Sequence, residues 1–352
     1  MTVSLSPVKP APWRRRARAS ASLLAALGLI TTGVRSQAEE ASIGVYSGRH
    51  YNSDQKLYQQ FTAQTGIQVK LLEAKDDSLI ERLRQEGKST PADVLVLVDA
   101  ARLERATSLD LLQPARSATL LRTVPLNLRD SKGRWVALTR RVRVVLVNPA
   151  LVKASSIRTY ADLANPALKG KLCLRDRKSV YNQSLVASQI LLRGDAKTQG
   201  WVKAMTSNVT QPYFSSDIPL IRALAKGQCG VGLVNTYYLA RLLNGESGPA
   251  DRALARKLLV VFPKPAHVNI SGAGITRYAK NPQAALKLIE FLASPVGGKG
   301  YAEANHEYPL KGYGNDPILK GFGRFQADGL SAEQLGSRNR DAVKLMEANG
   351  WL

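Results

Sequence analysis

The sequence predicts an α/β protein of two lobes joined by two extended crossovers. Strand-like and helix-like segments alternate over residues 42–98, a second α/β unit begins at residue 159, and two long extended segments lie at 134–149 and 267–279. With 352 residues and 44% hydrophobic residues, the chain is long enough for two domains. We predict an N-terminal lobe of residues 39–140 and 272–318 and a C-terminal lobe of residues 141–271 and 319–352.

Residues 1–38 have the features of a secretory signal peptide. A basic stretch at Arg14–Arg18 is followed by an apolar stretch at about Ala21–Val34 and by a plausible cleavage site near Ser36–Ala38. The apolar stretch is too short for a membrane span, and no cysteine follows it, which excludes a lipoprotein anchor. Arg14 and Arg15 also fit a twin-arginine signal, so both the Sec and the Tat route remain open. We therefore expect an exported, periplasmic protein.

The first lobe begins with a strand, helix, strand, helix, strand order. The first helix has Leu57, Tyr58 and Phe61 on one face, and Gly66 suits its C-terminal end. The third strand, DVLVLV, is apolar throughout, as in a parallel strand buried on both faces. This order predicts an open parallel sheet with helices on both faces. The expected strands are 42–48, 67–74 and 93–98, and the expected helices are 52–66 and 77–87.

The second lobe is reached through residues 134–149, which are too many for one ordinary strand and are expected to cross from one sheet into another. The segment 267–279 is the second crossover, and an amphipathic helix over 281–294 follows it. In open α/β sheets ligands bind beyond the C-terminal ends of the strands, so those ends should face each other across a cleft. The elements expected in between are a unit starting at 159–174, helices near 182–193 and 216–226, a strand at 229–234 and a helix from about 237.

Cys173 and Cys229 are the only cysteines in the chain. Each lies in a short apolar, strand-like run, so the two could be near neighbours in one lobe. In an oxidising compartment they could form one disulfide, and the alternative is a pair of buried free thiols.

The formal net charge of +23 could indicate a nucleic-acid or anionic-surface partner. The segment before Glu39 carries six of the basic residues and no acid, so the mature chain would still carry +17. These residues are scattered, however, and the mature part holds no polybasic block. Since export also removes the protein from the chromosome, we interpret the charge as a solvated basic surface and expect no nucleic-acid partner.

Tyrosines gather in three loops that follow strands. His50 and Tyr51 lie in YSGRHYNSD, Tyr181 lies in DRKSVYNQS, and Tyr237 and Tyr238 lie side by side in NTYYLAR. In the expected fold, all three loops lie at strand ends that face the cleft. Other tyrosines sit in or beside amphipathic patterns and are interpreted as packing residues, namely Tyr58, Tyr160, Tyr278 and Tyr301.

Clustered phenols favour a small, highly charged, oxygen-seeking cation, of which ferric iron is the common biological example. A phenol has a pKa near 10, and such an ion can displace its proton. Asn235 or Thr236 could cap the helix that carries Tyr237 and Tyr238, and the helix dipole would then favour their negative charge. Arg241, one turn later, would lie over the same face and could neutralise the cluster. Taken alone, the tyrosine pair could equally be aromatic packing at a helix start.

In these motifs the chain resembles the periplasmic ferric-ion-binding proteins of ABC importers, most closely their cyanobacterial, tyrosine-rich branch. The resemblance covers nearly all of the mature chain and is strongest at VYSGRHYNSD, TYADLANPALKGKL and VNTYYLARLL. It implies the two-lobed periplasmic binding protein fold, Fe³⁺ as the transported ligand, a permease partner in the inner membrane and a monomer. It also implies that the iron ligands are His50, Tyr51, Tyr181, Tyr237 and Tyr238, and that Arg141 lies just behind them.

Two departures and several alternatives remain. Relatives outside that branch use a glutamate just after the third strand, where this chain has Val98 and Asp99, so no glutamate ligand is carried over. Those relatives also bind an anion, a requirement that Tyr51 could partly replace. His50 could contact the metal or only donate a hydrogen bond nearby. An oxyanion or polyamine receptor on the same fold is the rival binding function. An exported enzyme is disfavoured because no Ser-His-Asp order, H-E-x-x-H or G-x-S-x-G is present.

Overall fold

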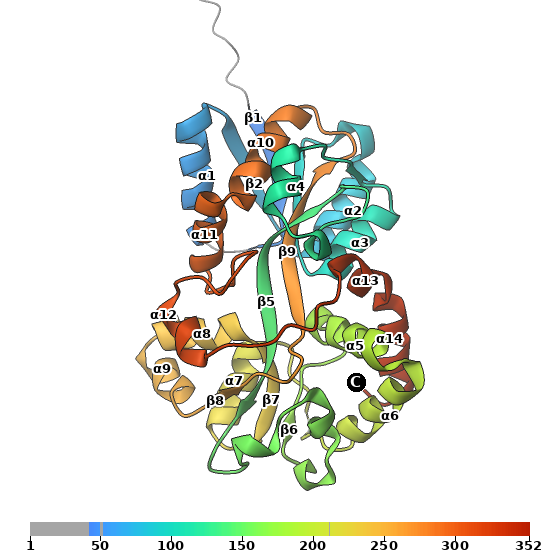
Figure 1. The fold of residues 1–352 in the computed structure, drawn as a ribbon, viewed down its shortest axis with the longest axis vertical. Helices are drawn as coiled ribbons and strands as arrows, with labels where there is room; N and C mark the ends of the chain where they lie inside the picture. The colour runs from blue at the N-terminus through green and yellow to red at the C-terminus, as the bar shows by residue number, and fades with distance from the viewer. Residues whose placement is uncertain (1–41, 50–51, 211) are drawn as a thin grey trace, which may run out of the picture. The chain divides into compact units, whose positions relative to one another are not determined.

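Two long strands form the centre of the fold. In the computed structural model, which describes residues 42–49, 52–210 and 212–352, β5 (Val136–Val147) and β9 (Val268–Thr276) pair antiparallel (Figure 1). β9 also pairs with β3 of the first lobe, and β5 also pairs with β7 of the second lobe. The strand order is β2-β1-β3-β9-β5-β7-β6, so the prediction of two crossovers that pass from one sheet region into another is confirmed.

The first lobe contains the parallel sheet that the sequence predicts. β1 (Ser42–Ser47) pairs in parallel with both β2 (Gln68–Glu73) and β3 (Val94–Val98). The connections are α1 (Asn52–Thr65) and α2 (Asp76–Glu86), and α1 is followed by Gly66 with a positive φ of 72°. All five residues of β3 are buried, because the strand is covered on both faces.

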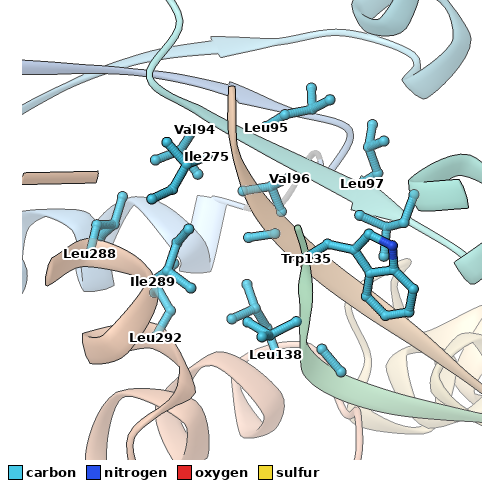
Figure 2. Close-up of a cluster of buried hydrophobic side chains, with 14 of the residues drawn as sticks. Val94, Leu95, Val96, Leu97, Trp135, Leu138, Ile275, Leu288, Ile289 and Leu292 are labelled. Atoms are coloured by element: carbon cyan, nitrogen blue, oxygen red, sulfur yellow. The ribbon is translucent and has the colours of Figure 1, made fainter. Parts of the chain in front are cut away.

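The core of this lobe combines segments that are far apart in the sequence. Figure 2 shows Val94–Leu97 of β3 beside Trp135, Leu138 and Ile275 near the two crossovers. One face of α10 (Pro282–Ala293) completes the cluster with Leu288, Ile289 and Leu292. The amphipathic helix predicted over 281–294 is therefore confirmed.

The second lobe is built around β7 (Val231–Asn235), which pairs antiparallel with β5 and in parallel with the two-residue β6 (Leu172–Cys173). The expected unit over 159–174 consists mainly of short 3₁₀ turns followed by β6. Cys173 and Cys229 form a disulfide, which resolves the alternative left open by the sequence. The main helices of this lobe are α5 (Val180–Arg193), α7 (Asp217–Ala225) and α8 (Thr236–Asn244).

Several elements were not expected from the sequence. α11 contains three glycines, which disfavour helix, but the side chain of Ser294 accepts a hydrogen bond from Gly297 N and caps its first turn. The others have at most 12 residues, so each holds few repeats of a helical or strand pattern. These elements are α3 (Ala100–Ser108), β4 (Leu112–Gln113), α4 (Ala118–Thr123), α6 (Asp195–Thr206), α9 (Pro249–Ala255), β8 (Leu259–Val261), α11 (Pro295–Glu303), α12 (Pro317–Phe322), α13 (Ala332–Ser337) and α14 (Asn339–Ala348).

Two local expectations were wrong. Tyr278 is 39% exposed and lies under the guanidinium of Arg277 rather than in a core, because it follows the end of β9 in a turn. Asn235 is at the N-cap position of α8, but its side chain does not cap the helix and instead accepts a hydrogen bond from Arg143 Nη1. Within the described residues, every helix is too short or too polar to cross a bilayer.

Candidate metal centre

Three phenols come together at the N-terminal ends of two helices. Tyr181 is the second residue of α5, and Tyr237 and Tyr238 are the second and third residues of α8. The hydroxyl of Tyr237 donates a hydrogen bond to that of Tyr181 over 3.2 Å. The ring centroids of Tyr237 and Tyr238 are 4.2 Å apart, and those of Tyr181 and Tyr238 are 6.5 Å apart. The structure therefore brings these three residues, named from the sequence, together in one cluster.

The local chain path explains this convergence. β7 ends at Asn235 and α8 begins at Thr236, so no loop separates the strand end from the two tyrosines. The N-terminal end of a helix carries partial positive charge, which stabilises an anionic oxygen nearby. Tyr237 is fully buried, whereas Tyr181 and Tyr238 are half-buried. Tyr237 thus packs as an aromatic residue and still directs its oxygen toward the other phenols.

Three arginines surround the ring of Tyr181. The guanidinium carbons of Arg141, Arg175 and Arg143 lie 5.3, 5.4 and 5.9 Å from its centroid. Arg143 and Arg175 share the buried carboxylate of Asp217, at 2.9 and 2.5 Å. This one carboxylate offsets one unit of their combined charge of +2, whereas Arg141 forms no ion pair with a carboxylate among the described residues.

Arg141 is buried on β5 and donates from Nη2 to the carbonyl of Ile270. Its Nε and Nη1 atoms have no hydrogen-bond partner among the residues that the structure describes. Burial alone would lower the pKa of this guanidinium. The phenols of Tyr181 and Tyr237 and nearby carboxyl groups outweigh that effect, so the pKa lies above its usual value. Arg141 is thus a permanent cation behind the phenols.

A cavity of about 430 Å³ lies between the two lobes at this point. Tyr181, Tyr238 and Arg241 line it from the second lobe. Arg241 lines the same cavity as two of the tyrosines, but its Nε donates to Glu246 Oε2 at 2.6 Å, so part of its charge is already compensated. The remaining lining residues come from the first lobe and are Gly48, Lys75, Asp76, Asp77, Val98 and Arg102.

Asp76 is a cavity residue that the sequence reasoning missed. Its Oδ1 accepts a hydrogen bond from Val98 N at 2.9 Å, and a Cβ atom on Gly48 would lie only 1.9 Å from the same oxygen. Burial raises the pKa of this carboxyl to about 7. The available signal was the acidic pair at the start of α2, directly after a strand end, but acidic residues are common in first helical turns.

His50 and Tyr51 lie outside the described residues. Arg49, immediately before them, is fully buried, and its guanidinium donates to Asp54, Glu307 and Ser271 at 2.8–3.2 Å. It also stacks over the ring of Tyr301 at 4.0 Å. The chain is therefore firmly anchored just before the predicted ligand pair.

The donor set of the cavity is dominated by oxygen. Over the described residues there is no group of three or more His, Cys, Asp and Glu side chains that could hold a metal ion. The phenol oxygens of the cluster suit a hard, highly charged ion.

Two α/β lobes joined by paired crossover strands, with a lined cavity between them, define a solute-binding protein. The chain belongs to the family of bacterial extracellular solute-binding proteins, which residues 47–299 match. It is 42% identical over 318 residues to iron uptake protein A1 of Synechocystis sp., covering 89% of this chain and 88% of that protein.

Solved structures agree with this assignment. The Trichodesmium FutA (IdiA) protein in complex with iron and citrate is similar with a TM-score of 0.85 and 42% identity, covering 89% of this chain and all of that one. The ferric binding protein from Campylobacter jejuni has a TM-score of 0.83 and 32% identity, covering 88% of this chain and all of that one. The two-lobed α/β fold predicted from the sequence is therefore confirmed.

Proposed function

We propose that this chain captures ferric iron in the interlobe cavity and delivers it to an ABC permease. The proposed ligands are His50, Tyr51, Tyr181, Tyr237 and Tyr238, and iron is the transported substrate rather than a resident cofactor. The observation that carries the proposal is the convergence of three phenols from two helix N-termini, two of which, Tyr181 and Tyr238, line the cavity. Relatives named for iron uptake and ferric iron binding support it.

The charges around the cavity suit Fe³⁺ held by phenolates. Four phenolates and one ferric ion would carry a net charge of −1. Arg141, which is buried behind Tyr181, would neutralise that excess without competing for the metal. Arg241 would contribute less because Glu246 already pairs with it. Iron binding would thus replace phenol protons with a metal ion in a site already provided with a counter-charge.

The rival binding functions fit the cavity less well. A polyamine would find two carboxylates, Asp76 and Asp77, but three cations, Lys75, Arg102 and Arg241, line the same cavity and would repel it. A simple oxyanion would have to compete with carboxylates for the arginines of the cavity, because Arg102 pairs with Asp77 and Arg241 pairs with Glu246. The family and the relatives are solute-binding and uptake proteins, not enzymes, so a catalytic function is not proposed.

The family supports a proposal about the location and partners of this chain. The family is extracellular, and relatives are named as periplasmic. We propose that this chain is exported to the periplasm by a Sec or Tat signal within residues 1–38 and acts as a monomer that docks on an inner-membrane permease. Nucleic acid has no part in this function.

The two lobes proposed from the sequence, 39–140 with 272–318 and 141–271 with 319–352, are kept with one change. α13 buries Ala332 and Leu335 in the core of the first lobe, whereas α14 buries Ala342 and Met346 in that of the second. We therefore propose that residues 332–337 belong with the first lobe. With this division, residues of both lobes line the cavity.

Iron titration tests the proposal directly. The purified full mature chain, mixed with ferric citrate, should develop an orange-to-purple charge-transfer band from phenolate to iron. Ca²⁺ and Zn²⁺ serve as controls and should give no such band, since neither ion accepts charge from a phenolate. A ferric complex that stays colourless would exclude tyrosine ligands, and no ferric binding at all would exclude the function.

A further inference from the structure

A buried carboxylate links the two lobes beside the candidate metal centre. Asp99 follows β3 of the first lobe, and its side chain is completely buried. Its Oδ1 accepts a hydrogen bond from the hydroxyl of Ser184 at 2.6 Å, and its Oδ2 accepts one from Asn269 Nδ2 at 2.9 Å. Ser184 belongs to α5 of the second lobe and Asn269 to the crossover strand β9. One carboxylate therefore contacts both lobes and the strand that joins them.

Asp99 is held rigidly on the crossover side. Its backbone N donates to Ile270 O at 2.9 Å, and Asn269 Oδ1 accepts from Ala100 N at 2.9 Å. Together with the bond from Asn269 Nδ2, these contacts fix residues 99 and 100 against residues 269 and 270. Ser184 is thus hydrogen-bonded to an acceptor that cannot readily follow it if α5 moves.

The backbone of Asp99 is itself unusual. Its φ of 100° lies in a region that side chains other than glycine rarely adopt. Such conformations persist only where the surrounding structure determines them strongly, and they concentrate at functional sites. Asp99 also caps α3 by accepting from Ala101 N, but a helix cap normally uses extended backbone, so capping does not require this φ.

The contact with Ser184 bears directly on the phenols. Ser184 is three residues after Tyr181, so the two lie on neighbouring positions of one helical face in the first turns of α5. Asp99 is also among the acidic groups that stabilise the charge of Arg141, whose guanidinium lies over the ring of Tyr181. Asp99 therefore acts on the position of Tyr181 through the helix and on its surroundings through Arg141.

We propose that Asp99 is a positioning residue of the iron site, which holds Tyr181 against the first lobe through its hydrogen bond to Ser184. This inference rests on the proposed function. Ferric iron held by Tyr181 from one lobe and by ligands from the other can leave only when the lobes separate. The Asp99–Ser184 bond opposes that separation and so slows the release of iron.

The test is the rate at which Ser184→Ala loses iron to excess EDTA, followed through the phenolate-to-iron band. The substitution removes a hydroxyl from a helix without adding volume, so the fold should be retained. Since the lost bond involves a carboxylate acceptor, release should become about tenfold faster or more. The band should keep its wavelength because every phenol remains.

Ser188→Ala is the matched control. Ser188 is one turn further along the same helix and equally buried, but its hydroxyl donates to Leu185 O within α5. Its iron release should match that of the wild type, and thermal melts of both apo variants should report any general loss of helix stability. A tenfold difference between the two variants at similar apo melting temperatures supports the proposal.

Other results overturn it. Release from Ser184→Ala within twofold of the wild type would show that the bond does not retain iron, and equal acceleration in both variants would assign the effect to helix stability. Either result leaves the proposed function intact, provided that the wild type shows its band. A wild type without the band would overturn both the function and this inference.

Discussion

The hydroxyl of Tyr237 lies 3.2 Å from that of Tyr181, although 56 positions separate the two residues in the chain. The tyrosine pair that stands out in the sequence is therefore one part of a larger cluster. Tyr237 is also fully buried, so it contributes to packing as well as to the tyrosine cluster. A variant that keeps the ring and removes the oxygen can separate these two roles.

The double variant Tyr237→Phe/Tyr238→Phe should lose iron binding and keep its fold. Apo stability should change by no more than about 1.5 kcal/mol, since one hydrogen bond to Tyr181 is lost and both rings remain. Iron affinity should fall by at least about 100-fold because two anionic ligands disappear. Isothermal titration with ferric citrate and thermal melts of the apo forms measure the two effects. Unchanged iron affinity would show that Tyr237 and Tyr238 have a purely structural role.

The pH dependence of iron binding provides a second test. Each tyrosine ligand gives up a proton when iron binds, so wild-type affinity should weaken as the pH falls. Tyr237→Phe alone exchanges one proton fewer, and its affinity should therefore depend less steeply on pH. Titrations at two pH values would show this, and parallel pH dependences would mean that Tyr237 does not ionise on binding.

Asp76 should make the apo protein less stable at high pH. Burial raises the pKa of this carboxyl from 3.8 to about 7, so the folded state binds its proton more tightly than the unfolded chain. Stability contributed in this way is present below about pH 4 and is lost as the pH rises to about 7. Asp76→Asn removes the ionisation and keeps an acceptor for Val98 N. It should be more stable than the wild type above pH 7, by up to about 4 kcal/mol, and similar to it near pH 4.

Urea denaturation of both apo proteins across this pH range measures the difference. Asp77→Asn is the control, because Asp77 is half-exposed and pairs with Arg102 and Arg105 on the surface. A stability difference between Asp76→Asn and the wild type that does not change with pH would contradict the prediction.

Gly48→Ala should disturb the cavity through Asp76. The added Cβ would lie 1.9 Å from Asp76 Oδ1, so the carboxylate must move and release Val98 N. We expect a loss of about 1–3 kcal/mol in apo stability. The double variant Gly48→Ala/Asp76→Ala should lose less than the two single variants together, because the clash is then absent. If the two losses of stability were additive, the effect of Gly48→Ala would not come from the clash with Asp76.

The disulfide should stabilise the second lobe without contributing to iron binding. It joins Cys173 and Cys229 across 56 positions, so its removal should cost about 2–4 kcal/mol. Neither cysteine lines the cavity, and the iron band of Cys173→Ala/Cys229→Ala should match the wild type. Thermal melts with and without a reducing agent test the first statement. The melting temperature of the double variant should not respond to the reducing agent, and an altered band would show coupling to the site.

The sequence could predict those parts of the site that depend only on the succession of strands and helices along the chain. Tyr237 and Tyr238 follow a buried strand directly, and Tyr181 begins a helix, so their placement at strand ends follows from alternating elements alone. Val94–Val98 could be read as a doubly covered strand for the same reason. Alternation and apolar runs are local properties that survive in a single sequence.

The parts that the sequence could not predict depend on contacts between distant segments. Asp76 becomes a cavity residue only because Gly48 and Val98 approach it. The side chain of Asn235 does not cap α8 because its oxygen accepts a hydrogen bond from Arg143, which lies on another strand. α13 was assigned to the second lobe from its place in the chain, yet it packs on α3 of the first lobe. Apart from the acidic pair at the start of α2, which is common in first helical turns, these contacts leave no signal in the residues around them.

The place of β9 in the sheet has a consequence for how the chain is made. β9 lies between β3 and β5, although β3 ends at Val98 and β9 begins only at Val268. A nascent chain therefore carries β3 with an unsatisfied hydrogen-bonding edge until about three quarters of the protein has been synthesised. The sheet of the first lobe therefore stays incomplete until most of the second lobe has been synthesised. A fragment that stops before β9 should behave as an aggregation-prone intermediate rather than as a domain.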